Sequence, residues 1–293
     1  MNETEGSVPV GKYSIYYRLF SEPGKRVPEK GTVVCLHGGP GATHDYLLPM
    51  SDLVSCGYDV LLYDQLGCGR SSLPRNVALF TIENNVEELE VLRRKLRLGR
   101  IHLMGSSYGG LLALAYALRY QRNLRSIITE GGLASVPLAS REMQRLKMQL
   151  PDAVIRTMEK YEEAGDYSNA EYLKAVEVFY RRHVCRLSVW PPELVYSMEH
   201  ISSSVYNTMN GPNEFTIIGN IRYWDISDRL GEICVPTLVT GGKYDEVTPV
   251  VARQIHRGVE DSKLLIFNES SHLPMWEERE RFFEKVSDFL NSL

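Results

Sequence analysis

The feature that most constrains this chain is GSSYG at residues 105–109, which fits the pattern G-x-S-x-G. An apolar run typical of a strand (101–104) precedes it, and a run rich in small residues, typical of a helix (111–120), follows it. A serine on such a sharp strand-to-helix turn has a strained backbone that only small neighbours permit. The following helix N-terminus favours developing negative charge. The string alone also fits an ordinary Gly/Ser-rich loop, but this context favours Ser107 as a nucleophile.

Strands and helices alternate along the first part of the chain. TVVCL (32–36) and DVLLY (59–63) are typical of buried strands that end in Gly-rich sequence, and residues 124–129 predict another strand. Residues 81–98 predict a helix with acids early and bases late, as the helix dipole favours, and Gly99 is well placed to end it. This alternation predicts a mostly parallel sheet covered by helices on both faces.

The pattern changes between residues 134 and 222, where the sequence is rather polar and predicts helices, most clearly at 168–183 and 192–204. The simplest layout is one α/β core, residues 1–133 and 223–293, interrupted by a helical cap insertion at 134–222. After the insertion the sequence predicts two more strands and a terminal helix, at PTLVT (236–240), KLLIF (263–267) and about 277–290.

Composition excludes several classes of protein. Of the 293 residues, 43% are hydrophobic and 24% charged, unlike a disordered, collagen-like or coiled-coil chain. The net charge of −4 and the lack of a basic stripe argue against a nucleic-acid partner. We expect no membrane association, because no signal peptide is evident and no stretch approaches the roughly 20 apolar residues of a membrane span. The five scattered cysteines form no CxxC pair, so the default is a reducing, cytoplasmic location without a zinc site.

A nucleophilic serine needs a base, and the base needs an orienting carboxylate. Asp245 lies in GGKYDEVTP after one late strand, and His272 lies in NESSHLPMW after the other. Both loops follow the carboxyl ends of strands, where α/β sheets place their sites. Ser107, Asp245 and His272 therefore predict a catalytic triad in the order Ser, Asp, His. Other histidines lack such a setting, although one in a loop could line the cleft: His102, His183, His200, His256 and, in the loop, His44.

Acyl transfer also needs N–H donors for the oxyanion of the tetrahedral intermediate. HGGPG (37–41) follows the first clear strand, and its glycines let backbone N–H groups approach without side-chain interference. We expect the N–H groups of Gly39 and Tyr108 to form the oxyanion hole. A plain Gly/Pro turn is the simpler interpretation of HGGPG, and it is compatible with this role. The chemistry requires no metal and no cofactor.

Five motifs together resemble the proline iminopeptidases of the α/β-hydrolase superfamily, from about residue 10 to the C-terminus: HGGPG, DQLGCGRS (64–71), GSSYGG, GGKYDEVTP and SSHLPMWEE. The similarity is greatest to the archaeal aminopeptidases that work downstream of the tricorn protease. The resemblance implies an α/β-hydrolase fold with a helical cap and the triad named above. It also implies that Glu214 and Glu246 bind the α-ammonium of a short peptide with a free N-terminus, since a desolvated ammonium needs opposite charge. A large protease complex as partner is implied by resemblance alone.

The prediction is a serine aminopeptidase that releases one N-terminal residue, preferably proline, from short peptides through an acyl-enzyme. Leu66 stands where many bacterial relatives have Arg, and the divergent cap shapes the substrate pocket in the family. Broader-specificity aminopeptidase or amino acid amidase activity therefore stays an alternative. A carboxylesterase or lipase with the same triad and a non-enzymatic binding protein also stay open. A dehalogenase or epoxide hydrolase is disfavoured because its nucleophile is normally Asp.

Overall fold

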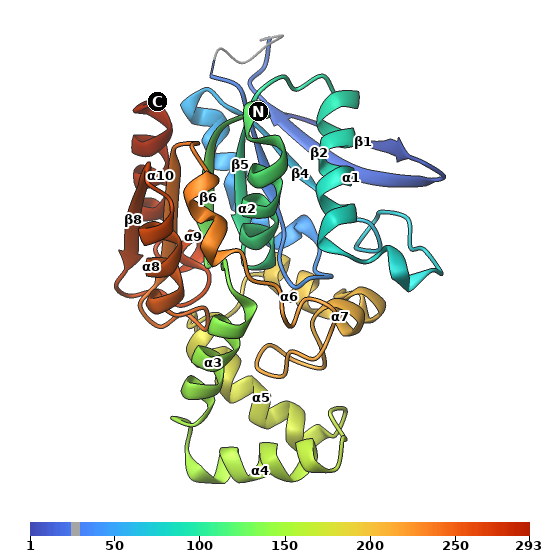
Figure 1. Ribbon diagram of the computed structural model, residues 1–293, viewed down its shortest axis with the longest axis vertical. Coiled ribbons are helices and arrows are strands. Elements are labelled where there is room, and N and C mark those ends of the chain that lie inside the picture. Colours follow the sequence, from blue (N-terminus) through green and yellow to red (C-terminus); the bar gives the residue numbers. More distant parts are fainter. Residues whose placement is uncertain (25–29) are drawn as a thin grey trace.

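The computed structural model describes residues 1–24 and 30–293. These residues form one eight-stranded sheet with the order β1-β2-β4-β3-β5-β6-β7-β8 (Figure 1). Neighbouring strands from β4 to β8 are parallel, and β2 is antiparallel to both of its neighbours, which confirms the predicted mostly parallel sheet. The strands are β1 (Asn2–Val10), β2 (Tyr13–Ser21), β3 (Thr32–Leu36), β4 (Asp59–Tyr63), β5 (Ile101–Ser106), β6 (Leu124–Glu130), β7 (Thr237–Gly242) and β8 (Ser262–Phe267).

Helices cover both faces of the sheet and its carboxyl edge (Figure 1). Four 3₁₀ segments of the described residues, one long and three short, lie between the other elements: η1 (His44–Cys56), η2 (Val77–Leu79), η3 (Gln121–Asn123) and η4 (Ser227–Glu232). The α-helices are α1 (Ile82–Lys95), α2 (Tyr108–Tyr120), α3 (Val136–Lys147), α4 (Asp152–Glu163), α5 (Ala170–His183), α6 (Pro192–Glu199), α7 (Ser203–Met209), α8 (Pro249–Gly258), α9 (Pro274–Glu277) and α10 (Arg279–Asn291).

Side-chain alternation along the buried strands gives the sheet two packed faces. Val34 and Leu36 of β3 belong to the apolar cluster that includes α1, α2 and α8. Val33 and Cys35 belong to the cluster that includes η1 and α10. Because both faces are covered, β3 is buried at every position and is mostly apolar, as parallel strands usually are.

The chain between β6 and β7 carries α3 to α7, which gather beyond one end of the sheet, at the bottom of Figure 1. The prediction of one helix at 192–204 is wrong, because α6 ends at Glu199 and α7 begins at Ser203. In a continuous helix the N–H of Ser202 would bond to the carbonyl four residues earlier. It donates instead to the carbonyl of Gly41, at 2.8 Å. A tertiary contact with the HGGPG loop therefore breaks this helix.

Two N-terminal strands, β1 and β2, lie outside the predicted elements. They form an antiparallel hairpin at one edge of the sheet. The side chains of β1 are mostly exposed, so its sequence NETEGSVPV lacks an apolar pattern. YSIYYRLFS in β2 is rich in aromatic residues typical of strands, and this signal could have revealed it. Within the described ranges, no helix has both the length and the apolar character needed to cross a bilayer.

Candidate active site

The predicted nucleophile lies at the turn between β5 and α2. Ser107 has φ +57° and ψ −122°, and its N–H donates to the carbonyl of Glu130 at 2.8 Å. The motif glycines are required by close packing: a Cβ on Gly105 would collide with the carbonyl of Gly109, and a Cβ on Gly109 with that of Leu36. The surrounding structure therefore holds Ser107 in a strained conformation, as the strand–turn–helix pattern predicts.

The predicted acid and base form a buried pair. Asp245 follows β7 and His272 follows β8, and Nδ1 of His272 lies 2.6 Å from Oδ1 of Asp245. The N–H of Val247 donates to the same oxygen at 2.8 Å, which fixes the carboxylate. Burial acts to lower the pKa of His272, but the Asp245 carboxylate and further buried acids hold that pKa well above its usual value. This pair has the geometry in which a carboxylate orients an imidazole.

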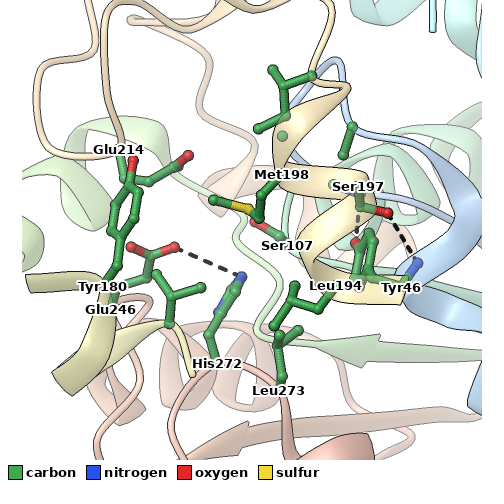
Figure 2. Close-up of a pocket in the computed structure, with 15 residues that line it drawn as sticks. Tyr46, Ser107, Tyr180, Leu194, Ser197, Met198, Glu214, Glu246, His272 and Leu273 are labelled. Carbon is green, nitrogen blue, oxygen red and sulfur yellow. Dashed lines mark hydrogen bonds and ion pairs between the residues drawn. The ribbon is translucent and has the colours of Figure 1, made fainter. Parts of the chain in front are cut away.

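Ser107 and His272 line one cavity between the sheet and the helices that lie between β6 and β7, with about 520 Å³ of empty space including its mouth (Figure 2). Nε2 of His272 is buried and has no hydrogen-bond partner among the described residues, so Ser107 does not donate to it here. Much of the remaining wall is apolar: Ala42, Val184, Leu194, Met198, Ile201 and Leu273. The cavity therefore has an apolar wall beside the reactive side chains of Ser107 and His272.

Two acids from distant parts of the chain also face this cavity (Figure 2). Glu246 is buried beside Asp245, and its Oε1 lies 3.9 Å from Nε2 of His272. Glu214, in the segment after α7, accepts a hydrogen bond of 2.6 Å from the hydroxyl of Tyr206. Burial raises the pKa of both glutamates, and repulsion by Glu214 raises that of Glu246 further. Two neighbouring carboxyls in a buried site are complementary to a cation.

The predicted oxyanion donors lie beside Ser107. Gly39, Tyr108 and Ser107 line a second cavity, and Gly39 also lines the first. Among the described residues, no hydrogen bond is found from the N–H of Gly39 or Tyr108. The N–H of Gly38, by contrast, donates to the hydroxyl of Tyr46 at 2.7 Å. Two free N–H groups beside a nucleophile are what a developing oxyanion needs.

Glu130, at the end of β6, is a buried acid that the sequence did not reveal. Its Oε2 accepts a hydrogen bond of 2.6 Å from the hydroxyl of Ser106, and its Oε1 has no partner in the described part of the chain. Burial raises the pKa of Glu130 to about 8. A Cβ on Gly131 would lie only 2.5 Å from Cε1 of His272, so this segment packs against the imidazole. No motif marks Glu130, because it ends an ordinary buried strand.

His44 does not line the cavity that holds His272. It is fully buried, and its Nδ1 lies 2.8 Å from Oδ1 of Asp64, which also accepts its backbone N–H at 2.9 Å. This pair joins the HGGPG loop to the DQLGCGRS loop. In residues 1–24 and 30–293, no group of three or more His, Cys, Asp or Glu side chains is placed to hold a metal ion.

Known proteins resemble this chain over its full length. Residues 31–279 match a family model described as alpha/beta hydrolase fold. A proline iminopeptidase from Saccharolobus solfataricus is 46% identical over 295 residues, covering 100% of this chain and 94% of the relative. A proline iminopeptidase from Thermoplasma volcanium is 48% identical over 289 residues, covering 98% and 96%. The chain belongs to the proline iminopeptidase family of α/β hydrolases.

Family membership confirms the predicted fold and makes the enzyme a serine aminopeptidase. Among solved structures, that of VinJ is similar to the enzyme with a TM-score of 0.94 and 40% identity, over 99% of each chain. A likeness of this extent includes the helices between β6 and β7 as well as the sheet.

Proposed function

We propose that the enzyme releases one N-terminal residue, preferably proline, from short peptides through an acyl-enzyme on Ser107. The observation that carries this proposal is the cavity in which Glu214 and Glu246 face Ser107 and His272. A protonated N-terminus compensates the charge of these buried acids, whereas a neutral ester has no group that does so. This difference favours an aminopeptidase over a carboxylesterase with the same triad.

In the proposed mechanism, the glutamates bind the α-ammonium and thereby set the register at one residue. Ser107 attacks the first carbonyl carbon while Nε2 of His272 accepts its proton, and Asp245 stabilises the imidazolium. The N–H groups of Gly39 and Tyr108 stabilise the oxyanion. The imidazolium then protonates the leaving amine, and a water molecule, deprotonated by His272, hydrolyses the acyl-enzyme.

The second cavity supports the preference for a compact apolar first residue. It has about 340 Å³ of empty space and shares Ser107 and Glu214 with the first cavity. The pyrrolidine ring of an N-terminal proline, which contains the ammonium nitrogen, can therefore lie in this cavity while the carbonyl attached to the ring faces the nucleophile. We propose residues 134–222 as the cap over the core of residues 1–133 and 223–293. The apolar wall of the second cavity comes from both the core and the proposed cap: Leu111, Leu133, Val136, Met143, Ile217, Ile221 and Val247.

Product analysis of short peptides tests this proposal. Peptides of the form Pro-X-Y-Z and Ala-X-Y-Z are incubated with the enzyme, and the products are identified by mass spectrometry. We expect free proline as the first product, no dipeptide, and slower release of alanine. Ser107→Ala should lose at least about 10³-fold in rate while its circular dichroism and melting temperature stay unchanged. Internal cleavage, or turnover retained by Ser107→Ala, would refute the proposal.

Two finer predictions belong with this function. Docking onto a larger protease stays a prediction, and it would be checked by co-purification of the enzyme with a protease from the source cells. A cytoplasmic location also stays a prediction from composition. Short peptides with a free N-terminus are the substrates that we propose in either case.

A further inference from the structure

The two ring nitrogens of His272 are in different situations. Nδ1 lies 2.6 Å from Oδ1 of Asp245 and is hydrogen-bonded to this carboxylate. Nε2, the nitrogen that must accept a proton from Ser107, has no hydrogen-bond partner among the described residues. In the described part of the chain, the acid within ion-pair distance of Nε2 is Glu246, whose Oε1 lies 3.9 Å away (Figure 2). In the empty site, the base therefore faces an acid of the binding pocket.

The titratable groups that interact with this imidazole are acids from three parts of the chain. Asp245 and Glu246 come from the loop after β7, Glu130 from the end of β6, and Glu214 from the cap. The carboxylates of Asp245 and Glu246, which lie within ion-pair distance of the ring, favour the imidazolium over the neutral ring. An imidazolium cannot accept the proton of Ser107, so a site that stayed in this state would be a poor catalyst.

The geometry points to a second role for Glu246. In the empty site, Glu246 pairs with the imidazolium of His272. When the substrate ammonium binds to Glu246 in place of the imidazolium, His272 loses a proton and can act as the base. This role rests on the proposed function, because the ammonium must bind at Glu246. The ammonium brings one positive charge to the cluster, and the imidazolium releases one proton from Nε2 to solvent. The charge of the cluster is unchanged, and no other reactant is needed.

The consequence is that the enzyme distinguishes substrates by their rate of reaction as well as by their binding affinity. A substrate with a free N-terminus activates the base on binding, whereas one without an amine leaves His272 paired with Glu246. A carboxylate about 4 Å from an imidazole in a protein raises the pKa of the imidazole by roughly one unit or more. The fraction of neutral imidazole is then lowered on the order of tenfold. Glu246 thus selects substrates through their reactivity as well as their binding.

An ester of a ring that resembles proline but lacks the amine separates this role from ammonium binding. The kcat/KM for p-nitrophenyl cyclopentanecarboxylate is measured from pH 5 to 9 with wild type, Glu246→Gln and Glu214→Gln. We expect the rising limb for Glu246→Gln to move to lower pH by about one unit, which makes this variant about tenfold faster than wild type on the ester near pH 7.

Glu214→Gln is the matched control, because it removes a carboxyl of the same pocket that is not within ion-pair distance of Nε2. Both variants should lose activity on a Pro-arylamide, but Glu214→Gln should shift the ester profile less. Equal shifts, no shift in Glu246→Gln, or no ester cleavage by any of the proteins would overturn the inference. Melting temperatures establish that both variants fold.

A second measurement needs no variant. In wild type, kcat for the Pro-arylamide reports the base with ammonium bound, and kcat/KM for the neutral ester reports it in the empty enzyme. We expect the rising limb of the first profile at lower pH than that of the second. Coincident limbs would overturn the inference while leaving the proposed function intact. Failure to cleave the Pro-arylamide would instead refute the proposed function itself.

Discussion

Four carboxyl groups surround the imidazole of His272, and each is held differently. Asp245 is fixed through one oxygen by the imidazole and a backbone N–H. Glu214 accepts from a tyrosine hydroxyl. Asp245, Glu246 and Glu130 each keep one buried oxygen without a partner in the described residues. Because an unpartnered buried carboxylate is destabilising, Glu130 favours protonation in the empty enzyme, whereas the nearby imidazole of His272 acts to lower the pKa of Glu246.

Glu130 leads to a prediction about stability. Its folded-state pKa of about 8 lies above the ordinary value of 4.5, so the folded protein holds a proton that the unfolded chain has lost. The free energy of unfolding therefore falls as the pH rises from 4.5 toward 8, by up to about 1.4 kcal/mol per pH unit from this group. Glu130→Gln should make this fall shallower, which urea unfolding from pH 5 to 8 would measure.

The control for this experiment is Glu280→Gln, an exposed glutamate in the first turn of α10. Its unfolding free energy should follow the wild-type pH dependence. If Glu130→Gln also follows the wild-type slope, the carboxyl of Glu130 is ionised in the folded protein. That result would contradict the conclusion that burial keeps Glu130 protonated.

Residues whose role follows from local sequence could be predicted. Ser107 lies in a short motif, and Asp245 and His272 each follow a strand, so spacing and chain order point to all three. Glu214 and Glu246 came only from the family resemblance, because a glutamate in a loop is usually solvated. Glu130 gave no signal, since its proximity to His272 depends on β6 and β8 being brought to one edge of the sheet.

At the scale of elements, a helix or turn can be predicted from the sequence when its backbone contacts are local, and it is missed when they involve distant segments. The elbow between β5 and α2 is local, and its glycines are required by contacts within the motif and with β3. The break between α6 and α7 is not local, because it depends on a hydrogen bond from Ser202 to Gly41. Periodicity therefore predicts a single helix at 192–204, and the tertiary contact decides otherwise.

The attachment of α6 to η1 is open to test. The Ser197 hydroxyl accepts the backbone N–H of Tyr46 at 3.0 Å and lies 2.8 Å from the hydroxyl of Thr43. Ser197→Ala would leave this buried N–H without an acceptor, so we expect a loss of about 1–3 kcal/mol in urea unfolding. Ser203→Ala, at an exposed position of α7, should change stability by less than about 0.5 kcal/mol. Equal effects would show that this hydrogen bond does not hold α6.

At the scale of the whole molecule, the site exists only where the core and the helices between β6 and β7 meet. The loops after β3, β5, β7 and β8 supply one side of the cavity, and the segments around α5, α6 and α7 supply the other. The alternation of strands and helices predicts the core, because each unit packs on its neighbours along the chain. The path of the inserted helices depends on contacts with distant loops, so their sequence predicts helices without predicting their arrangement.

The most direct test of this account compares cleavage of a Pro-arylamide with that of its N-acetyl derivative by the same enzyme preparation. Acetylation removes the positive charge that Glu214 and Glu246 are placed to bind and leaves the scissile bond unchanged. The account predicts fast cleavage of the free amine and a loss of at least about 10²-fold on acetylation, since a charged hydrogen-bonded group is lost from a buried site. Equal cleavage of both compounds would contradict the claim that the enzyme reads a free N-terminus.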